Sequence, residues 1–385
     1  MALADSNRVD LYFSEETLWG ETPSTPAMTQ LRYTGETLAY SKQSGQSEVI
    51  RSDRMRDAIL ELGYSAGGDI KFELAYGSFD TLLSGLFGAA WSTPVNISSS
   101  AIAATALTDK FSGAVGIFNS VTVGQWIKVA GFYEAANNGI FRVTAKAGDG
   151  SDITVDTSLA DEGAGEAVTM KGSYLRNGIV EKSYLIEKRF TDITQYIYFD
   201  GMRVGGMTLN IAAKQIINGS FTFSGKEGVA SASSVAGSST AASAAVPMSA
   251  SANVGTITKD GVALATPLKS ITLNVNNNPR AKDRIGSKAA AGIGLGFFEV
   301  TGTVEAYFED LVLYNLLIGH TNLSLSWRCT DVSGNVMVFT IPKLYFMEGD
   351  PKAESGNQDV MLPLTFAAIR NATYNCAMQI DIMAA

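Results

Sequence analysis

The chain offers few residues for catalysis or metal binding. Its 385 residues include one histidine, His320, and two cysteines, Cys329 and Cys376. A Ser-His-Asp triad could use only His320, and a metal site with two histidines is excluded. The cysteines form neither a CxxC unit nor a disulfide framework, which is typical of a protein made in a reducing compartment. We therefore expect no cofactor, no metal ion and no enzymatic activity.

Several short patterns resemble sites, and each has a plainer interpretation. Residues 149–152 (Asp-Gly-Ser-Asp) lack the closing Glu of a calcium loop and predict a hairpin turn. Residues 292–296 have glycine spacing like that of a nucleotide loop, but they precede a strand and open no helix that could receive a phosphate. Glu305 and Glu309 could pair as acid and base on a helix, whereas the strand expected there places Glu305 on a solvated face. We expect His320 to cap a helix or to lie on the surface.

Charge is low and acidic, and the basic residues are clustered. The net charge is −9, from 29 basic and 38 acidic residues, which argues against a protein that grips nucleic acid through its phosphates. The basic clusters fall in two expected long loops, 41–67 and 276–296, without interleaved aromatic residues that would stack on bases. Solvated loop charge is one interpretation, and contact with neighbouring subunits is the other. The contact candidates are Arg51, Asp53, Arg54, Arg56, Arg280, Lys282, Asp283, Arg284 and Lys288.

The pattern of glycines and alternating apolar residues predicts a mainly β chain with an internal duplication. The 38 glycines and a charged fraction of 17% fit strands better than a helical bundle. Three pairs of segments match in the same order, and the first pair predicts a strand followed by a short amphipathic helix. Chance recurrence of such patterns is the alternative. The pairs are 68–85 with 302–319 at an offset of 234, 189–193 with 328–332 at an offset of 139, and 220–223 with 363–366.

The difference between the first two offsets indicates about 95 additional residues in the first copy. Strand-like runs separated by Asn-Asn-Gly and Gly-Asp-Gly turns predict that these residues form a small β-domain, with Ala-, Ser- and Gly-rich flanks acting as tethers. A stretch of Ala and Ser predicts a linker or mobile loop. The expected organisation is a first copy at 1–90 and 178–227, an inserted domain at 91–177, a linker at 228–255 and a second copy at 256–385.

No segment predicts export or a membrane span. The N-terminus carries Asp5, Arg8 and Asp10 in place of the apolar stretch of a secretory signal. The longest apolar run, 311–318, is interrupted by polar residues and is far shorter than the roughly 18 residues that a membrane helix needs. We expect assembly in a cytoplasm.

Several short segments occur in a specific order along the chain. They are Glu16-Thr17, Glu21-Thr-Pro23, Leu31-Arg-Tyr33, the Ser-x-x-Ile-Arg-x-x-Arg stretch at 47–54, the strand at 68–74, and the Gly-Gln-Trp-Ile, Gly-Phe-Tyr and Asn-Asn-Gly runs at 124–139. In these segments and their order, the chain resembles over nearly its whole length the tail tube (major tail) proteins of long-tailed bacteriophages. The resemblance implies a β-sandwich or barrel with one flanking helix, rings whose inner strands join into a closed β-barrel, and stacking of the rings into a hollow tube that conducts DNA. It implies no catalysis.

Combined with the duplication, the resemblance predicts an assembly of this chain with itself. Two copies per chain would let three chains complete a pseudo-sixfold ring, closed by heterologous contacts. The two basic loops and the N-terminal arm are candidates for contacts between rings, and an acidic lumen would let DNA pass without specific binding. By resemblance, further partners are the tape measure protein and tail-end proteins, and the location is a virion tail assembled in the bacterial host cytoplasm. We expect the inserted domain on the outer surface, which suits a flexible, sheathless tail. A β-sandwich adhesin or receptor-binding module is the alternative, and an enzyme is a third.

Overall fold

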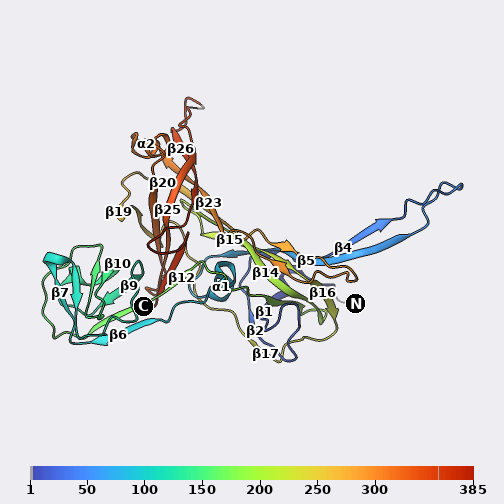
Figure 1. Ribbon diagram of the computed structural model, residues 1–385, viewed down its shortest axis with the longest axis horizontal. Coiled ribbons are helices and arrows are strands. Elements are labelled where there is room, and N and C mark those ends of the chain that lie inside the picture. The colour runs from blue at the N-terminus through green and yellow to red at the C-terminus, as the bar shows by residue number, and fades with distance from the viewer. Residues whose placement is uncertain (1–2, 354) are drawn as a thin grey trace.

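The computed structural model describes residues 3–353 and 355–385, and it confirms the mainly β prediction. The described residues contain two α-helices, α1 (Asp80–Phe87) and α2 (Val312–Ile318). Three short 3₁₀ turns lie at Ser6–Arg8, Ala106–Thr108 and Ala135–Asn137. Figure 1 shows a body of packed sheets, a compact β unit at one end, and a long hairpin that projects from the opposite end.

One antiparallel sheet of eight strands runs through the body. Its order is β4, β5, β15, β14, β20, β23, β26, β25. The first four strands and the last four have the same order of connections, so the same four-stranded unit occurs twice. The bounds are β4 (Ala39–Gln46), β5 (Ile59–Glu73), β15 (Asn218–Gly225), β14 (Gln195–Ala212), β20 (Leu268–Asn276), β23 (Glu299–Tyr307), β26 (Met361–Ala368) and β25 (Val336–Glu348).

The two units also share their irregularities. The β14–β15 ladder shifts register between Val204 and Gly206, and the β25–β26 ladder shifts between Phe346 and Glu348. Both shifts lie at an offset of 142 along the chain. Because a β-bulge redirects a strand at one defined residue, its recurrence aligns the two units residue by residue.

Shorter strands form a second layer on each unit. β1 pairs with β13, and β13 pairs with β14, so the N-terminal residues 9–15 belong to the body. The equivalent strand on the second unit is β24, which pairs with β25. The bounds in this layer are β1 (Val9–Glu15), β2 (Ala27–Gln30), β13 (Tyr184–Phe190), β16 (Glu227–Ser231), β17 (Ser238–Thr240), β18 (Val254–Lys259), β19 (Val262–Ala263), β24 (Leu323–Thr330) and β27 (Gln379–Met383). The short strand β3 (Gly35–Glu36) pairs with β5 and extends the eight-stranded sheet beside β4.

The main core lies between these layers and α1. Alternate residues of the strands point into it, as the period of two requires. Phe72, Phe79 and Phe221 form an aromatic cluster in which Phe72 lies 4.6 Å from Phe79 and 4.7 Å from Phe221, measured between ring centroids. On the second unit Trp327 is fully buried and stacks on Phe339. The same core cluster includes residues from both units, so the units pack as one body.

A separate core forms within residues 95–170. The strand-like runs at 125–130, 139–144, 153–156 and 167–170 are present as β9, β10, β11 and β12. The predicted tethers are wrong, because β6 and β7 occupy the first flank and β12 continues from this unit into the body, where it pairs with β27. The bounds are β6 (Val95–Ser99), β7 (Ala103–Thr105), β8 (Lys110–Ser112), β9 (Trp126–Ala130), β10 (Gly139–Lys146), β11 (Asp152–Val155) and β12 (Val168–Arg176).

A buried polar network fixes this unit against β27. The Trp126 backbone N–H donates to Asp381 Oδ1 at 3.0 Å, and Gln379 Nε2 donates to Asp381 Oδ2 at 2.7 Å. Arg176 Nε donates to Gln379 Oε1 at 2.6 Å. Asp381 is completely buried, and this burial raises its pKa to about 7 despite the hydrogen bonds and the nearby arginines.

This pKa predicts a stability that depends on pH. An unfolded Asp has a pKa of about 4, so between about pH 4 and pH 7 the folded protein binds more protons than the unfolded chain. The free energy of unfolding should therefore fall as pH rises through this window. We expect Asp381→Asn to reduce this fall, because an amide does not titrate, and to lower stability at pH 5, because its NH2 group would face the Gln379 Nε2 donor. Urea unfolding at pH 5 and pH 8 measures it, and an unchanged pH slope would contradict it.

The Ala- and Ser-rich stretch 228–255 runs along the body instead of forming a mobile loop. It contributes to β16, β17 and β18, and β17 lies parallel to β2. Arg32 donates to the carbonyls of Ser243 and Ala245, and Met248 is buried. Main-chain hydrogen bonds therefore order a segment whose own side chains are too small to build a core.

Candidate assembly surfaces

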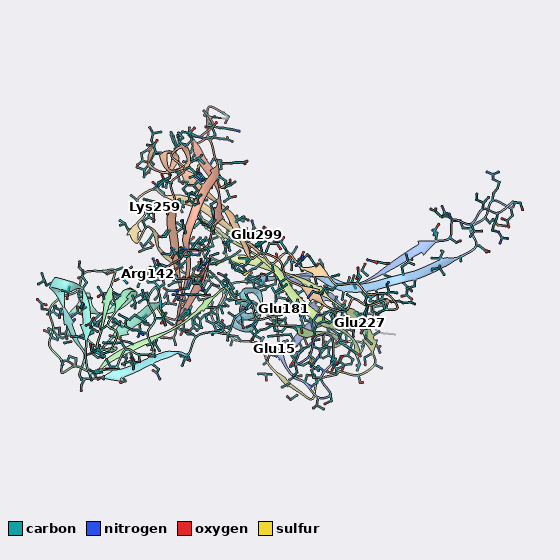
Figure 2. All side chains as sticks on the ribbon, in the orientation of Figure 1. Glu15, Arg142, Glu181, Glu227, Lys259 and Glu299 are labelled. Carbon is teal, nitrogen blue, oxygen red and sulfur yellow. The ribbon has the colours of Figure 1, made fainter. Side chains whose placement is uncertain are left out.

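A projecting hairpin occupies the first of the two expected loops. The prediction of a loop at 41–67 is wrong, because β4 and the first part of β5 form a long antiparallel hairpin. Figure 2 shows side chains on both of its faces with no other part of the chain packed over its outer half. Its apolar side chains are more than half exposed at Val49, Ile50, Met55, Ile59, Leu60 and Leu62. Such a surface is typical of a contact with another subunit.

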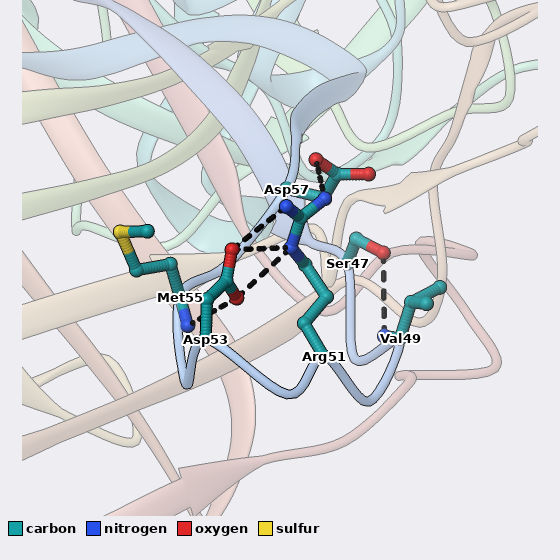
Figure 3. Close-up of polar contacts among 6 residues, drawn as sticks. All are labelled: Ser47, Val49, Arg51, Asp53, Met55 and Asp57. Atoms are coloured by element: carbon teal, nitrogen blue, oxygen red, sulfur yellow. Dashed lines mark hydrogen bonds and ion pairs between the residues drawn. The ribbon is translucent and has the colours of Figure 1, made fainter.

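The tip of this hairpin holds the first cluster of candidate residues (Figure 3). Arg51 lies 2.7 Å from Asp53 and 2.8 Å from Asp57, and its guanidinium lowers the pKa of the Asp53 carboxyl. These ion pairs stabilise the turn, and they pair the Arg51 charge within the hairpin itself. Arg54, with a φ of 59°, and Arg56 are exposed at the same tip. In the described part of the chain neither of them forms a salt bridge, so both remain available to a neighbour.

The second cluster lies on the connection between β20 and β23. Two short strands, β21 (Arg280–Ala281) and β22 (Ile293–Gly294), shape this loop. Lys288 lies against β5, where its Nζ is 2.7 Å from Glu61 Oε2 and its carbonyl accepts from the Tyr64 N–H. The candidates Arg280, Lys282, Asp283 and Arg284 are exposed. Of the candidates in this second cluster, Lys288 is the one that contacts the hairpin, and it does so at the base of the hairpin, away from the tip.

The eight-stranded sheet has an open edge at each end. On β3 and β4, residues 35–46 pair with β5 on one side, and no described strand pairs with their other side. At Leu38 two side chains take the place of a neighbouring strand as hydrogen-bond partners of the backbone. The Leu38 N–H donates to Glu36 Oε2 at 2.8 Å, and the Leu38 carbonyl accepts from Lys188 Nζ at 2.9 Å. Lys188 and Glu36 also form an ion pair at 2.8 Å. Capping of this kind protects an edge from unspecific strand pairing.

Sequence reasoning missed this open edge and the Lys188–Glu36 pair that caps it. Lys188 is buried although it is charged, and it points inward from β13 at the end of the apolar run Tyr184–Ile186. A buried lysine needs a partner. Its position in a strand that otherwise faces the core was the available signal, but the partner, Glu36, is 152 residues away.

The opposite end of the sheet exposes an apolar patch around α2. Leu311, Val312, Ile318 and Met347 are each more than half exposed. In α1, by contrast, six residues are buried, whereas only Leu313 is buried in α2. His320 follows α2 with a φ of 45° and is exposed, as expected for a residue that ends a helix, and it stacks on Tyr345 at 4.6 Å. Equivalent helices in the two units thus differ in what covers them.

One face of the eight-stranded sheet is polar, opposite to the core. Its side chains are mainly Thr, Ser and Asn, and five carboxylates accompany two lysines. Glu305 lies on this face, as the strand pattern predicted, and its Oε1 is 2.9 Å from Lys269 Nζ. A cavity of about 1130 Å³ opens between this face and residues 348–359. The charged residues of the face are Asp69, Lys71, Glu73, Lys269, Glu299, Glu305 and Glu348, and Glu299 is labelled in Figure 2.

Comparison with known protein families places the chain in one of them. None of the helices among the described residues is long and apolar enough to cross a membrane. No curated protein matches the chain. A family model described as phage tail tube protein matches residues 6–368, which is nearly the whole chain. The chain therefore belongs to the phage tail tube protein family, whose members are structural components of the bacteriophage tail.

Proposed function

We propose that this chain polymerises into stacked trimeric rings that form a hollow tail tube, through which DNA leaves for the host. The main support is the eight-stranded sheet, in which one four-stranded unit occurs twice and an open edge remains at each end. A head-to-tail contact between such edges closes into a ring when the rotation per unit is correct. With two units per chain, three chains supply the six units of a pseudo-sixfold ring. Closure would also remove the open edges.

In this ring the polar face lines the lumen, because the other face of the sheet is covered by the core and α1. The Thr, Ser and Asn side chains on this face are neutral, and the carboxylates outnumber the lysines, so the face has no surplus of positive charge to bind DNA. Such a wall repels phosphates at short range and lets the duplex slide. DNA would then be a molecule in transit that is not specifically bound.

The domain organisation follows the two units. We assign residues 1–90 and 178–227 to the first copy of the tube fold, 228–255 to the linker and 256–385 to the second copy. The separate core within 95–170 supports an inserted domain at 91–177. It lies at the end of the body opposite the projecting hairpin (Figure 1), which supports a place on the outer wall of a sheathless tail. The tape measure protein, tail-end proteins and assembly in the host cytoplasm complete the proposal.

Self-assembly tests the proposal directly. The purified chain should form hollow tubes that are visible by negative-stain electron microscopy, and cryo-electron microscopy of these tubes should show three chains per ring. Discrete oligomers without tubes would favour a receptor-binding module. Rings of six chains would contradict the trimer.

We expect the two basic clusters to act in stacking of the rings. Arg54 lies at the tip of the projecting hairpin and Arg284 on the exposed β20–β23 loop, so both can reach a neighbouring ring. The double variant Arg54→Glu and Arg284→Glu should leave the monomer folded, because neither side chain is buried, but it should prevent tube growth. Circular dichroism and electron microscopy measure the two effects. The variant Arg54→Lys and Arg284→Lys keeps the charge and should still polymerise. Normal tubes from the Glu variant would refute the role.

A further inference from the structure

We propose that residues 36–41 of one chain pair antiparallel with residues 348–353 of the next chain in the ring, in the register that β20 keeps with β14. The partner is a second copy of this chain. This inference rests on the proposed ring and specifies which edges join in it. It follows from a junction between the two units that the chain already contains.

That internal junction is the β14–β20 ladder. Residues 206–212 of β14 pair with residues 276–270 of β20 without a register shift. The Asn277 N–H donates to the Gly205 carbonyl at 2.8 Å, and the Ala213 N–H donates to the Lys269 carbonyl at 2.9 Å. The backbone N–H and C=O groups of successive residues point to opposite sides of a strand. The N–H and C=O groups of the odd-numbered residues of β20 therefore point toward β14 and bond to it. Pairs such as Thr208 with Asn274 are then the closer, non-hydrogen-bonded pairs.

The equivalent residues at the two ends of the sheet can be identified. The bulge that precedes Gly206 recurs before Glu348, and the Asn210–Asn218 pair recurs as an isolated bridge between Lys352 and Met361. Residues 348–352 thus already follow the path that 206–210 take along the neighbouring strand. At the other end, Gly35 pairs with Lys71 as Ser270 pairs with Glu305. Transfer of the β14–β20 register predicts these pairs between chains: Glu348 with Ser41, Asp350 with Ala39 and Lys352 with Thr37.

The capped edge at Leu38 fits this pairing. Leu38 corresponds to Leu273, and its partner in the next chain is Pro351, which corresponds to Leu209. Proline has no N–H to donate, so a strand pair at this point lacks one hydrogen bond. Lys188 Nζ already donates to the Leu38 carbonyl and supplies the donor that Pro351 lacks. The Leu38 N–H can exchange Glu36 for the Pro351 carbonyl. A buried lysine on one chain thereby complements a proline on the other.

The exposed patch around α2 provides an independent observation. In the internal junction, the β20–β23 connection covers the end of α1, where Asn277 Nδ2 donates to the Leu86 carbonyl at 2.8 Å and Phe298 lies 5.3 Å from Phe87. The equivalent connection of the first unit is the base of the β4–β5 hairpin. It carries exposed Leu60 and Leu62, while Ile318 on α2 has no such cover. The hairpin base of the next chain therefore covers α2.

Engineered disulfides test the register. Ala39→Cys with Asp350→Cys, and Thr37→Cys with Lys352→Cys, should cross-link assembled tubes under mild oxidation. Non-reducing gels should show a ladder that ends at three chains, because the ring is closed. Thr208→Cys with Asn274→Cys is the matched control, since it sits at the equivalent place inside one chain and should give a cross-linked monomer. The native Cys329 and Cys376 are buried, and burial raises their thiol pKa values to about 12 and about 11, so they do not compete.

The out-of-register pair Ser41→Cys with Lys352→Cys separates the outcomes. It should give at most a tenth of the cross-linking of the in-register pairs. Tubes that form but cross-link equally through this pair, or through none of the in-register pairs, would overturn the proposed seam and leave the tube function standing. If the wild-type chain forms no tubes, the proposed function fails first. If one of the two in-register double variants does not form tubes even when its cysteines are kept reduced, the cross-linking of the other in-register variant decides whether the seam is correct.

Discussion

Replacing Tyr40 by proline is expected to leave the monomer folded and to abolish tube formation at concentrations where the wild type polymerises. Tyr40 corresponds to Val275, whose backbone faces β14 within the chain. The Tyr40 N–H therefore faces outward from the open edge, where proline is tolerated in a monomer. In the ring its loss leaves the Gly349 carbonyl of the next chain unpaired. An unsatisfied group of this kind costs about 1–3 kcal/mol per seam, which is a rise of about fivefold to more than about 100-fold in the critical concentration.

Three matched variants make this result specific. Tyr40→Ala removes the same side chain but keeps the N–H, and it should polymerise at less than about threefold higher concentration. Val275→Pro breaks the equivalent ladder inside one chain, so it should lower the thermal unfolding midpoint of the monomer, which Tyr40→Pro should not. Sedimentation gives the critical concentration and circular dichroism gives the midpoint. Tubes from Tyr40→Pro at the wild-type concentration would show that the chains join elsewhere.

The regular parts of the fold were predictable because one face of each strand is buried. Alternation at Ile70, Phe72 and Leu74 marked β5, and the leucines that follow marked α1, since core burial imposes a period on the sequence. The same reasoning placed β9 to β12. The outer half of the β4–β5 hairpin escaped because both of its faces are exposed, so residues 41–60 carry no period and are indistinguishable from a loop. A strand that would be buried only in the assembly shows a weaker alternation of apolar and polar residues than a strand of the core.

The assembly surfaces depend on contacts that no local pattern contains. The offsets indicated two copies, but the β14–β20 junction that joins them became visible only with the strand pairing. The Lys188–Glu36 pair likewise connects distant strands. Residues 228–255 were expected to be mobile because their side chains cannot form a core, yet backbone hydrogen bonds hold them. Main-chain pairing is nearly independent of side-chain type, so composition alone could not predict it.

The proposed lumen predicts a second large effect, on the rate at which DNA is released. Glu73 and Glu299 lie on the polar face of the sheet, one from each unit, so a ring of three chains would carry six of these carboxylates. Glu73→Lys with Glu299→Lys would turn a repelling wall into one that holds phosphates. Binding through phosphates weakens steeply with salt, because each contact releases a counterion. We therefore expect virions with this variant to release DNA at least about tenfold more slowly at 50 mM salt and to recover at 200 mM salt.

The location of the charge, and not its total, should decide this outcome. Glu134→Lys with Glu166→Lys changes the net charge by the same amount on exposed residues of the inserted unit, so release should stay at the wild-type rate. Glu73→Gln with Glu299→Gln removes the acids without adding cations, and it should slow release far less than the lysine variant. Release from triggered virions is followed with a DNA-binding dye. Equal slowing by the two lysine variants, or no dependence on salt, would mean that this face does not meet the DNA.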